Sequence, residues 1–310
     1  MNGLGDALTG FLVRAVLPLA RATPLARLHA VGDALGNALF SCLRSHRRIG
    51  ERNLEIAFGD AMTADQRRGI VRATFRGIAK SALEFAKMPA LAADELRAIT
   101  IIEGREHLDN VLATGSGLLY YTAHFGNWEL MGARLCLEGY PLTAIVRELH
   151  NSYVSDLVNR VRAEVGMKVL IHGNALMNSI RALRRNEMLG ILADQDAGPG
   201  ALFVPVFGEM AASVAGPSMI ARKTGAPVVP AFDIRGEDGR HTIRILPPLE
   251  LQRTDDASSD AEENTRRMLG CVEQMIRRYP EQWLWLHKRW RTRPPGDERN
   301  LYGFARDGRR

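Results

Sequence analysis

The sequence predicts an α/β fold: a mostly parallel central sheet flanked by helices, preceded by an N-terminal amphipathic helical anchor. From Gly117 onward, short apolar runs of strand type alternate with segments of helical periodicity. Such alternation produces crossover units and therefore parallel strands. Polar residues follow three of the predicted strands, namely His124, Arg147 and Asp194. Because parallel strands deliver their carboxyl ends to one edge of a sheet, we expect these three side chains to converge.

The composition is that of an ordinary globular protein. The 310 residues are 46% hydrophobic and 25% charged, which is enough for one large α/β domain or two small ones. The cysteines Cys42, Cys136 and Cys271 are widely spaced, which indicates free thiols and argues against a disulfide scaffold or a zinc site. A net charge of +6 favours acidic partners. No DNA- or RNA-binding motif accompanies that charge, so we expect no nucleic-acid partner.

The N-terminal segment, residues 1–45, is predicted to associate with a membrane. Residues 4–40 contain no run of about 20 uncharged apolar residues, so a membrane-spanning helix is not indicated. Apolar residues instead alternate with Arg14 and Arg21, which share a helical face, and this pattern is typical of an in-plane amphipathic anchor. The alternatives are a helix packed on the domain and a degenerate membrane span. The arginines of residues 41–58 form either a solvated face or a contact with lipid phosphates.

The remaining elements follow in order along the chain. Helices are predicted over residues 63–88, 94–112, 153–164, 175–185, 213–224 and 261–279, and strands over 117–123, 142–146, 168–171 and 188–193. Residues 228–234 and 241–246 are predicted to pair as a hairpin. Residues 253–260 are expected to form a polar loop. Tryptophans 283, 285 and 290 lie among basic residues, a composition typical of a membrane interface.

The most informative stretch is centred on His124, which follows an apolar strand and precedes a Gly126-Asn127 turn. Asn127 is a good N-cap for the helix that follows, and it places Glu129 in the first helical turn. A His-x4-Glu spacing is expected about once by chance in a chain of this composition. The other such pair, His46 and Glu51, lies in a basic segment with no strand before it. The alternative interpretation of His124 is a hydrogen-bonded histidine at a strand end.

Several common catalytic motifs are absent from the sequence. There is no G-x-S-x-G elbow, no G-x-G-x-x-G or Walker A sequence, and no H-E-x-x-H. Asp194-Gln-Asp196 is a D-x-D triplet of the kind that holds a metal and a sugar nucleotide in many glycosyltransferases. A metal-dependent glycosyltransferase using Asp194 and Asp196 is therefore one alternative, and a non-catalytic membrane-surface binding protein is another.

The segment His124-Phe-Gly-Asn-Trp-Glu-Leu130 closely resembles a block of the late acyltransferases of lipid A biosynthesis. These lauroyl and myristoyl transferases belong to the wider glycerolipid (lysophospholipid) acyltransferase superfamily. The resemblance extends over nearly the whole chain through five further blocks, which are Arg52–Phe58, Ala193–Gly198, Phe203–Gly208, Thr224–Pro230 and Trp285–Pro294.

The resemblance implies a glycerolipid acyltransferase-like fold, with an acyltransferase domain over residues 46–296 and a polar tail over 297–310. It implies a membrane-associated O-acyltransferase of lipid A and lipopolysaccharide biosynthesis, with acyl carrier protein as donor and a lipid A precursor as acceptor. Acylation of another lysolipid or glycolipid from acyl-CoA is the alternative. No cofactor and no metal is implied. The expected location is the cytoplasmic face of the inner membrane, held peripherally or by one N-terminal anchor on an anionic surface.

In that superfamily the His and acidic residue of the H-x4-D/E block are catalytic, which implies catalytic roles for His124 and Glu129. Chemistry agrees, because a histidine of near-neutral pKa is a natural base for a hydroxyl. We expect Glu129 to orient the imidazole and stabilise its cation, as a third group does in serine triads.

Without a serine or cysteine nucleophile in the motif, direct transfer is expected. Backbone amides near Gly126 and Asn127 are candidate oxyanion donors. Arg147, Asp194 and Asp196 are candidate acceptor-binding residues, and Phe203–Phe207 is predicted to wall the acyl chain.

Overall fold

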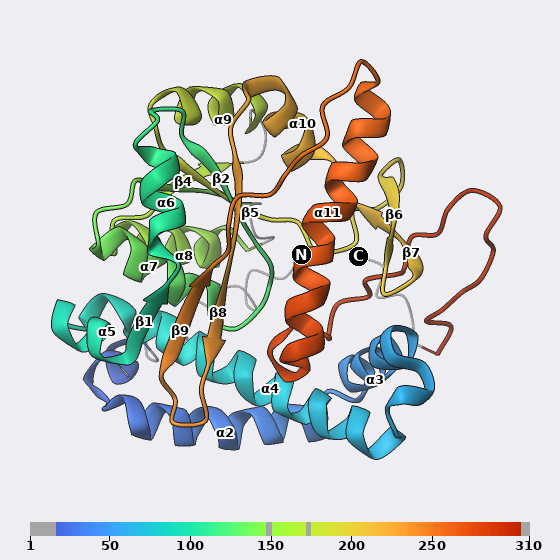
Figure 1. The fold of residues 1–310 in the computed structure, drawn as a ribbon. Coiled ribbons are helices and arrows are strands. Elements are labelled where there is room, and N and C mark those ends of the chain that lie inside the picture. The colour runs from blue at the N-terminus through green and yellow to red at the C-terminus, as the bar shows by residue number, and fades with distance from the viewer. Residues whose placement is uncertain (1–16, 147–150, 172–174, 305–310) are drawn as a thin grey trace.

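The computed structural model describes residues 17–146, 151–171 and 175–304. Within these residues the centre of the molecule is a seven-stranded sheet of order β1-β9-β8-β2-β5-β3-β4 (Figure 1). Its strands are β1 (Thr100–Glu103), β2 (Leu118–Thr122), β3 (Leu142–Val146), β4 (Lys168–Ile171), β5 (Met188–Leu192), β8 (Val228–Arg235) and β9 (His241–Ile245). Strands β8, β2, β5, β3 and β4 are mutually parallel, whereas β9 is antiparallel to β8 and β1 follows the direction of β9. The predicted mostly parallel sheet and the β8–β9 hairpin are confirmed.

The sheet brings two of the three predicted strand ends together. Strand β2 is buried along its whole length, as its uninterrupted apolar and aromatic sequence requires of a strand covered on both faces. It pairs in parallel with β5 in a register that sets Thr122 opposite Leu192. His124 and Asp194 each follow two residues later, so they emerge at the same level of the same edge. Arg147, the third predicted residue, lies outside the described residues.

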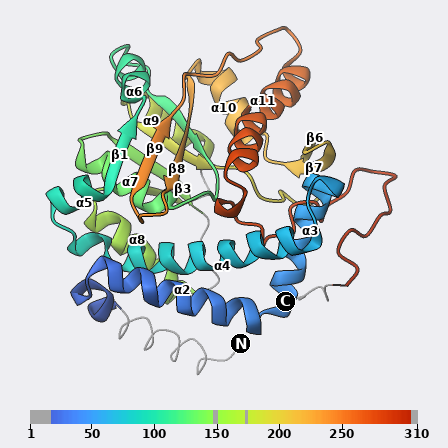
Figure 2. The same ribbon diagram turned by 60° about the horizontal axis from the view of Figure 1, so that its bottom comes forward.

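Helices cover the sheet and one end of the molecule. They are α2 (Leu25–Cys42), α3 (Arg44–Phe58), α4 (Ala64–Lys87), α5 (Ala93–Ile99), α6 (Arg105–Leu112), α7 (Trp128–Leu137), α8 (Ser152–Glu164), α9 (Ala175–Arg184), α10 (Gly216–Thr224) and α11 (Ala257–Arg278), with short 3-10 turns at Gly59–Ala61, Met88–Ala90 and Pro280–Gln282. Helix α4 begins at a capping box formed by Thr63 and Gln66. Figures 1 and 2 show α2 running alongside α4.

The close packing of α2 on α4 depends on small residues. A Cβ at Gly36 would lie 2.5 Å from the Cα of Arg76, so only glycine allows the two backbones to approach this closely. The face of α2 that meets α4 is buried at Leu28, Gly32 and Phe40 as well. No helix of the described residues is long and apolar enough to cross a membrane. The described part of the predicted anchor is therefore a helix packed on the domain, and residues 1–16 lie outside the described residues.

Three predicted elements differ from the structure. The expected helix over 94–112 is interrupted by β1, a four-residue edge strand whose identity depends on pairing with the distant β9. The helix expected from Ser213 begins at Gly216, because Ser213 ends strand β7 (Glu209–Ser213), which pairs with β6 (Leu202–Val206) in a separate two-stranded sheet. Helix α11 starts at Ala257 with Asp256 as its N-cap, so part of the predicted loop is helical.

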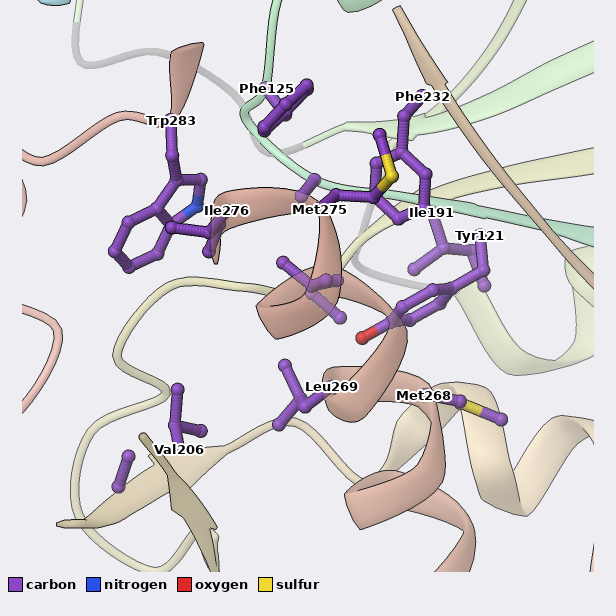
Figure 3. Close-up of a cluster of buried hydrophobic side chains, with 14 of the residues drawn as sticks. Tyr121, Phe125, Ile191, Val206, Phe232, Met268, Leu269, Met275, Ile276 and Trp283 are labelled. Carbon is purple, nitrogen blue, oxygen red and sulfur yellow. The ribbon is translucent and has the colours of Figure 1, made fainter. Parts of the chain in front are cut away.

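A large apolar core lies between the sheet and α11. Figure 3 shows Leu269 and Ile276 of that helix among Tyr121, Ile191 and Phe232 from the strands. The tryptophans predicted to face a membrane interface belong to this core instead: they are 4% (Trp283), 0% (Trp285) and 0% (Trp290) exposed.

The C-terminal residues also pack inward. The guanidinium of Arg289 is buried and donates to the carbonyl of Ala212 and to Ser213 Oγ. In the expected polar tail, Tyr302 is buried and its hydroxyl donates to Asn53 Oδ1.

Candidate active site

At the carboxyl edge of the sheet the half-buried His124 pairs with the buried Asp194. The Nδ1 of His124 lies 2.8 Å from Asp194 Oδ1, and the backbone N–H of His124 donates to Asp194 Oδ2 over 3.0 Å. The indole N–H of Trp283 donates to the same Oδ2 over 2.8 Å. Because a carboxylate only accepts, the neutral imidazole carries its proton on Nδ1 and leaves Nε2 with a free lone pair. The histidine is thereby oriented as a base.

The loop that carries His124 is held from the C-terminal segment. Leu284 N–H donates to the carbonyl of His124 over 3.0 Å, and Gly126 N–H donates to the carbonyl of Gln282 over 2.9 Å. Phe125 is fully buried behind this loop. The position of the imidazole is therefore set by contacts to residues some 160 positions later in the chain as well as by β2, a link that no local pattern reveals.

Glu129 occupies the first turn of α7, as predicted, but it does not contact the imidazole. Its carboxylate is paired with Arg162 of α8, whose Nε lies 3.0 Å from Glu129 Oε2, and it accepts from the Trp128 indole over 3.2 Å. The expectation that Glu129 orients the ring is therefore wrong for this structure, since Asp194 occupies Nδ1. Glu129 acts on His124 through space, and the Trp128 ring lies edge-on to the imidazole with centroids 5.0 Å apart.

The electrostatics of the pair raise the basicity of His124 and the acidity of Asp194. Burial lowers the pKa of His124, but the charge of Asp194 and its hydrogen bond raise it by more, with Glu129 adding to the same direction, so the net pKa is above its ordinary value. Burial raises the pKa of Asp194, yet the charge of His124 and the hydrogen bonds from His124 and Trp283 lower it to about 2. Asp194 is thus ionised at every physiological pH.

The backbone amides expected to bind the oxyanion already donate hydrogen bonds within the protein. Gly126 N–H is bound to Gln282, and Asn127 N–H donates to Asp233 Oδ2 over 2.7 Å. Asn127 does cap α7, with its Oδ1 accepting from Leu130 N–H over 3.0 Å. These two residues therefore shape the turn beside His124, and the prediction that their amides stabilise an oxyanion is not supported by the geometry.

A buried ionic network that the sequence did not predict holds the Gly126-Asn127 turn in place. Glu84 of α4 accepts from Asn127 Nδ2 over 2.7 Å and is paired with the guanidinium of Arg235. His241 Nδ1 lies 2.8 Å from Asp233 Oδ2, and His29 Nε2 of α2 lies 2.6 Å from Glu84 Oε1. Hydrogen bonds and the charge of Arg235 lower the pKa of Glu84 well below its usual value despite burial, so Glu84 is ionised. Its members are too far apart in sequence to form a motif.

Asp196 lies beside the site, and its buried carboxylate is bound by other residues of the protein. Its carboxylate accepts from Arg291 Nη2 and from the Thr292 hydroxyl, each over 3.0 Å, and its backbone N–H donates to His287 Nε2. The carboxylate is not free for the substrate contact predicted for it. Among the described residues, no group of three or more His, Cys, Asp or Glu side chains is arranged to hold a metal ion.

Two cavities meet at His124. The sheet-side cavity has a volume of about 450 Å³ and is walled by β2, β3 and β5 together with α7 and α8, and it is lined largely by apolar residues that include Met131, Leu142, Ala144, Met167 and Leu192. The helix-side cavity measures about 820 Å³ and is lined by α4, the β8–β9 turn and residues 281–284. His124, Trp128, Glu129 and Val158 line both cavities.

The predicted acyl wall lies away from both cavities, whereas Gln195 lies beside the imidazole. Phe203–Phe207 lines neither of these cavities, because β6 packs against α11 in the core. Gln195 was not predicted: its Nε2 lies 3.5 Å from the Nε2 of His124, and its side chain lines the sheet-side cavity. Its place between the two aspartates of the D-x-D triplet was the only available signal.

Comparison with known proteins gives a consistent result. Residues 4–292 match the family model described as bacterial lipid A biosynthesis acyltransferase. The chain is 32% identical over 286 residues to the lipid A biosynthesis lauroyltransferase of Escherichia coli K12, covering 91% of this chain and 90% of that protein. It is 28% identical over 275 residues to the palmitoleoyltransferase of the same strain, covering 88% and 87%. It is also 26% identical over 291 residues to the phosphatidylinositol mannoside acyltransferase of Mycolicibacterium smegmatis, covering 93% of each chain.

Proposed function

We propose, from the premise that this chain belongs to the bacterial lipid A biosynthesis acyltransferases and is an acyltransferase, that it transfers a fatty acyl chain from a thioester to a hydroxyl of a lipid A precursor, with His124 as general base. The observation that carries this proposal is the position of His124 at the junction of two cavities, with Nδ1 held by Asp194. Each of the two cavities then receives one substrate, and the base lies between the cavities.

Proton transfer is the first step of the proposed reaction. Nε2 of His124 takes the proton of the acceptor hydroxyl as its oxygen attacks the thioester carbonyl. The imidazolium that forms is stabilised by Asp194 at Nδ1 and, through space, by Glu129. The proton then passes to the leaving thiolate. No serine or cysteine nucleophile is required, so transfer is direct.

The negative charge on the oxygen of the tetrahedral intermediate needs hydrogen-bond donors that are not already bound to other acceptors of the protein. The side-chain amide of Gln195 lies beside Nε2 and faces the cavity, and we assign it as an oxyanion donor. The Glu129–Arg162 pair borders the same cavity and keeps a carboxylate near the ring without blocking it. Glu129 therefore contributes electrostatically, while Asp194 orients the ring.

The sizes and the lining residues of the cavities assign the two substrates. The sheet-side cavity is the smaller of the two and is lined by fewer charged residues, which suits an acyl chain. The helix-side cavity is larger and carries charged residues of both signs, including Lys80, Arg235 and Glu129, which suits a polar headgroup. Acyl carrier protein, an acidic partner that complements a chain of net charge +6, is the proposed donor, and acyl-CoA is the alternative. No cofactor is proposed.

The choice of a lipid A precursor as acceptor follows from the names of the relatives. Most of the relatives above are named for lipid A, and the mycobacterial one is named for a phosphatidylinositol mannoside. Family membership favours acyl transfer over the glycosyltransferase alternative. The D-x-D geometry agrees, because Asp194 serves His124 while Asp196 serves Arg291 and Thr292.

Peripheral membrane binding is proposed from the surface of α2. Val31 (52%) and Leu35 (44%) are exposed on the side of α2 away from α4, and Leu43 (40%) follows the helix. Exposed arginines lie at the same end of the molecule: Arg44 follows Leu43, and Arg68 and Arg72 of α4 lie over the Phe40 ring, on the side of α2 that meets α4. Exposed apolar side chains with arginines nearby suit the anionic face of a bilayer. The proposed location is the cytoplasmic face of the inner membrane.

The test is acyl transfer in vitro from a labelled acyl carrier protein, with acyl-CoA as the matched donor, to a panel of lipid A precursors and mannosylated phosphatidylinositol, with EDTA present. Product on a lipid A precursor supports the proposal. Product only on the mannolipid would correct the acceptor, and no product on any acceptor would overturn the function.

A further inference from the structure

The sheet-side cavity contains two hydroxyl groups in a wall that is otherwise largely apolar. Tyr120 and Thr122 lie two residues apart on β2, so their side chains project from the same face of the sheet. Both line the cavity, together with Leu142, Ala144 and Leu192 of the neighbouring strands. The intervening Tyr121 belongs to the core on the opposite face.

Neither hydroxyl has a hydrogen-bond partner among the described residues. Tyr120 is 2% exposed and Thr122 is 4% exposed, and the Oη of the first and the Oγ1 of the second are both buried and unpaired. An unpaired buried hydroxyl is unfavourable, and Phe and Val would fill the same space without that penalty. Burial holds the pKa of Tyr120 well above its ordinary value, so the phenol keeps its proton and remains a donor.

The backbone leaves room beside the Tyr120 ring. Gly190 of β5 is its partner in the parallel register, and it also lines the cavity. An added Cβ at Gly190 would lie 3.3 Å from Leu142 Cδ1, so a side chain there would reduce the space in the cavity. Glycine at residue 190 leaves this part of the cavity wall, opposite Tyr120 in the sheet register, without a side chain.

We propose that this cavity is a subsite for an acyl chain that carries a hydroxyl group, so that the preferred donor is a hydroxyacyl thioester. The chain hydroxyl pairs with Tyr120 Oη and Thr122 Oγ1, which satisfies both groups at once. At the ordinary rise of a strand, Thr122 and Tyr120 lie about 7 and about 13 Å before His124, so the hydroxyl that they bind lies several carbons from the reacting carbonyl. This inference rests on the proposed acyl transfer and names its substrate class.

One competing explanation is a trapped water molecule. Asp233 Oδ1 on the adjacent strand β8 is also buried and unpaired, and its charge acts on Tyr120. A water held between Tyr120 and Asp233 would satisfy both without any substrate hydroxyl. In that case the enzyme would show no preference for a hydroxylated chain, so the two explanations give different outcomes in one assay.

The experiment compares a series of hydroxyacyl chains, with the hydroxyl moved outward from carbon 3, with the saturated acyl chain of equal length on acyl carrier protein, as competing donors for the wild type. We expect kcat/KM to favour one of the hydroxyacyl donors by about tenfold or more. Tyr120→Phe and Thr122→Val, which keep shape and remove one hydroxyl each, are expected to reduce that ratio toward one. Tyr121→Phe, on the other face of the same strand, is the matched control and is expected to keep the wild-type ratio.

Two outcomes would overturn the inference. A wild-type ratio within twofold of one at every hydroxyl position, with the donors turned over, would refute the hydroxyl subsite while leaving the acyltransferase function intact. A preference that survives in the double variant Tyr120→Phe/Thr122→Val would assign it to other residues. Displacement of a fluorescent fatty acid by the free hydroxy and saturated fatty acids of the same series gives the same comparison without turnover, so a failure of the proposed function leaves this test decisive.

Discussion

Replacing Asp194 by asparagine should disable the base without changing the shape of the site. In the structure, Asp194 Oδ2 accepts from two fixed donors, His124 N–H and the Trp283 indole, while Oδ1 faces His124 Nδ1. An asparagine must therefore turn its oxygen toward the two donors and its NH₂ toward Nδ1. The amide then donates to Nδ1, which forces the neutral ring to carry its proton on Nε2. That tautomer cannot accept a proton from the substrate.

The expected loss in kcat for Asp194→Asn is about 10³–10⁴-fold, the size reported when the carboxylate of a serine triad is replaced by its amide. The pH dependence should move as well. Asp194 raises the pKa of His124 against the effect of burial, so the acid limb of kcat/KM lies above pH 6.5 in the wild type and should fall below it in the variant, where burial dominates.

Stability provides the control for Asp194→Asn. The folded pKa of Asp194, about 2, is below its ordinary 3.8, so the pair contributes on the order of 2 kcal/mol that is present above pH 4 and is lost as the pH falls through 2. Urea unfolding at pH 7 should therefore show a loss of about this size with a folded baseline intact. A folded variant that keeps more than a tenth of wild-type kcat would refute the assignment of Asp194 to Nδ1.

Four further predictions follow from the site and its supports. Gln195→Ala should lower kcat about 10²-fold with little change in KM in steady-state assays, because an oxyanion donor acts only in the transition state; a change confined to KM would contradict this role. Glu84→Ala should destabilise folding by about 3–5 kcal/mol in urea titrations, since it leaves Arg235 and Asn127 Nδ2 buried without their acceptor, and an unchanged midpoint would count against the network. Asp233 raises the pKa of His241 to about 9 against the effect of burial. The stabilisation of the fold by the protonated His241 is therefore full below pH 6.5 and is lost as the pH rises through 9. The free energy of unfolding of the wild type should fall by up to about 3 kcal/mol across this window, and that of His241→Gln should not. Leu35→Asp should weaken binding to anionic vesicles in co-sedimentation while Met219→Asp, on α10 and even more exposed, should not; equal effects would remove α2 from the membrane contact.

Much of the scaffold could be predicted because its signals are local. The alternation of buried strands with amphipathic helices, the cap at Asn127 and the capping box at Thr63 are all set within a few residues. The convergence of His124 with Asp194 follows from parallel topology alone, without knowledge of any side-chain contact. Strand β1 was missed because four residues become a strand only through pairing with a partner far along the chain.

The chemistry inside the site was harder to predict because it depends on competition for hydrogen bonds. Glu129 lies five residues from His124, yet Arg162 pairs with it and Asp194 takes the imidazole. The local sequence around the turn gives no partner for the backbone N–H of Asn127, but Asp233 of the neighbouring strand β8 accepts a hydrogen bond from it. A segment rich in tryptophan and arginine has the same composition whether it lies in a core or at a membrane interface. Only the burial of Trp285 and Arg289 in the structure distinguishes these two environments.

The central claim is that His124, at the junction of the two cavities, is the base for acyl transfer. The most direct test measures transfer of a labelled acyl chain from acyl carrier protein to a lipid A precursor by wild type and by His124→Ala in parallel, with EDTA present and the fold of both checked by thermal unfolding. We predict product from the wild type and a rate at least 10²–10⁴-fold lower from the folded variant. A folded His124→Ala enzyme that keeps nearly full transfer activity would contradict the mechanism.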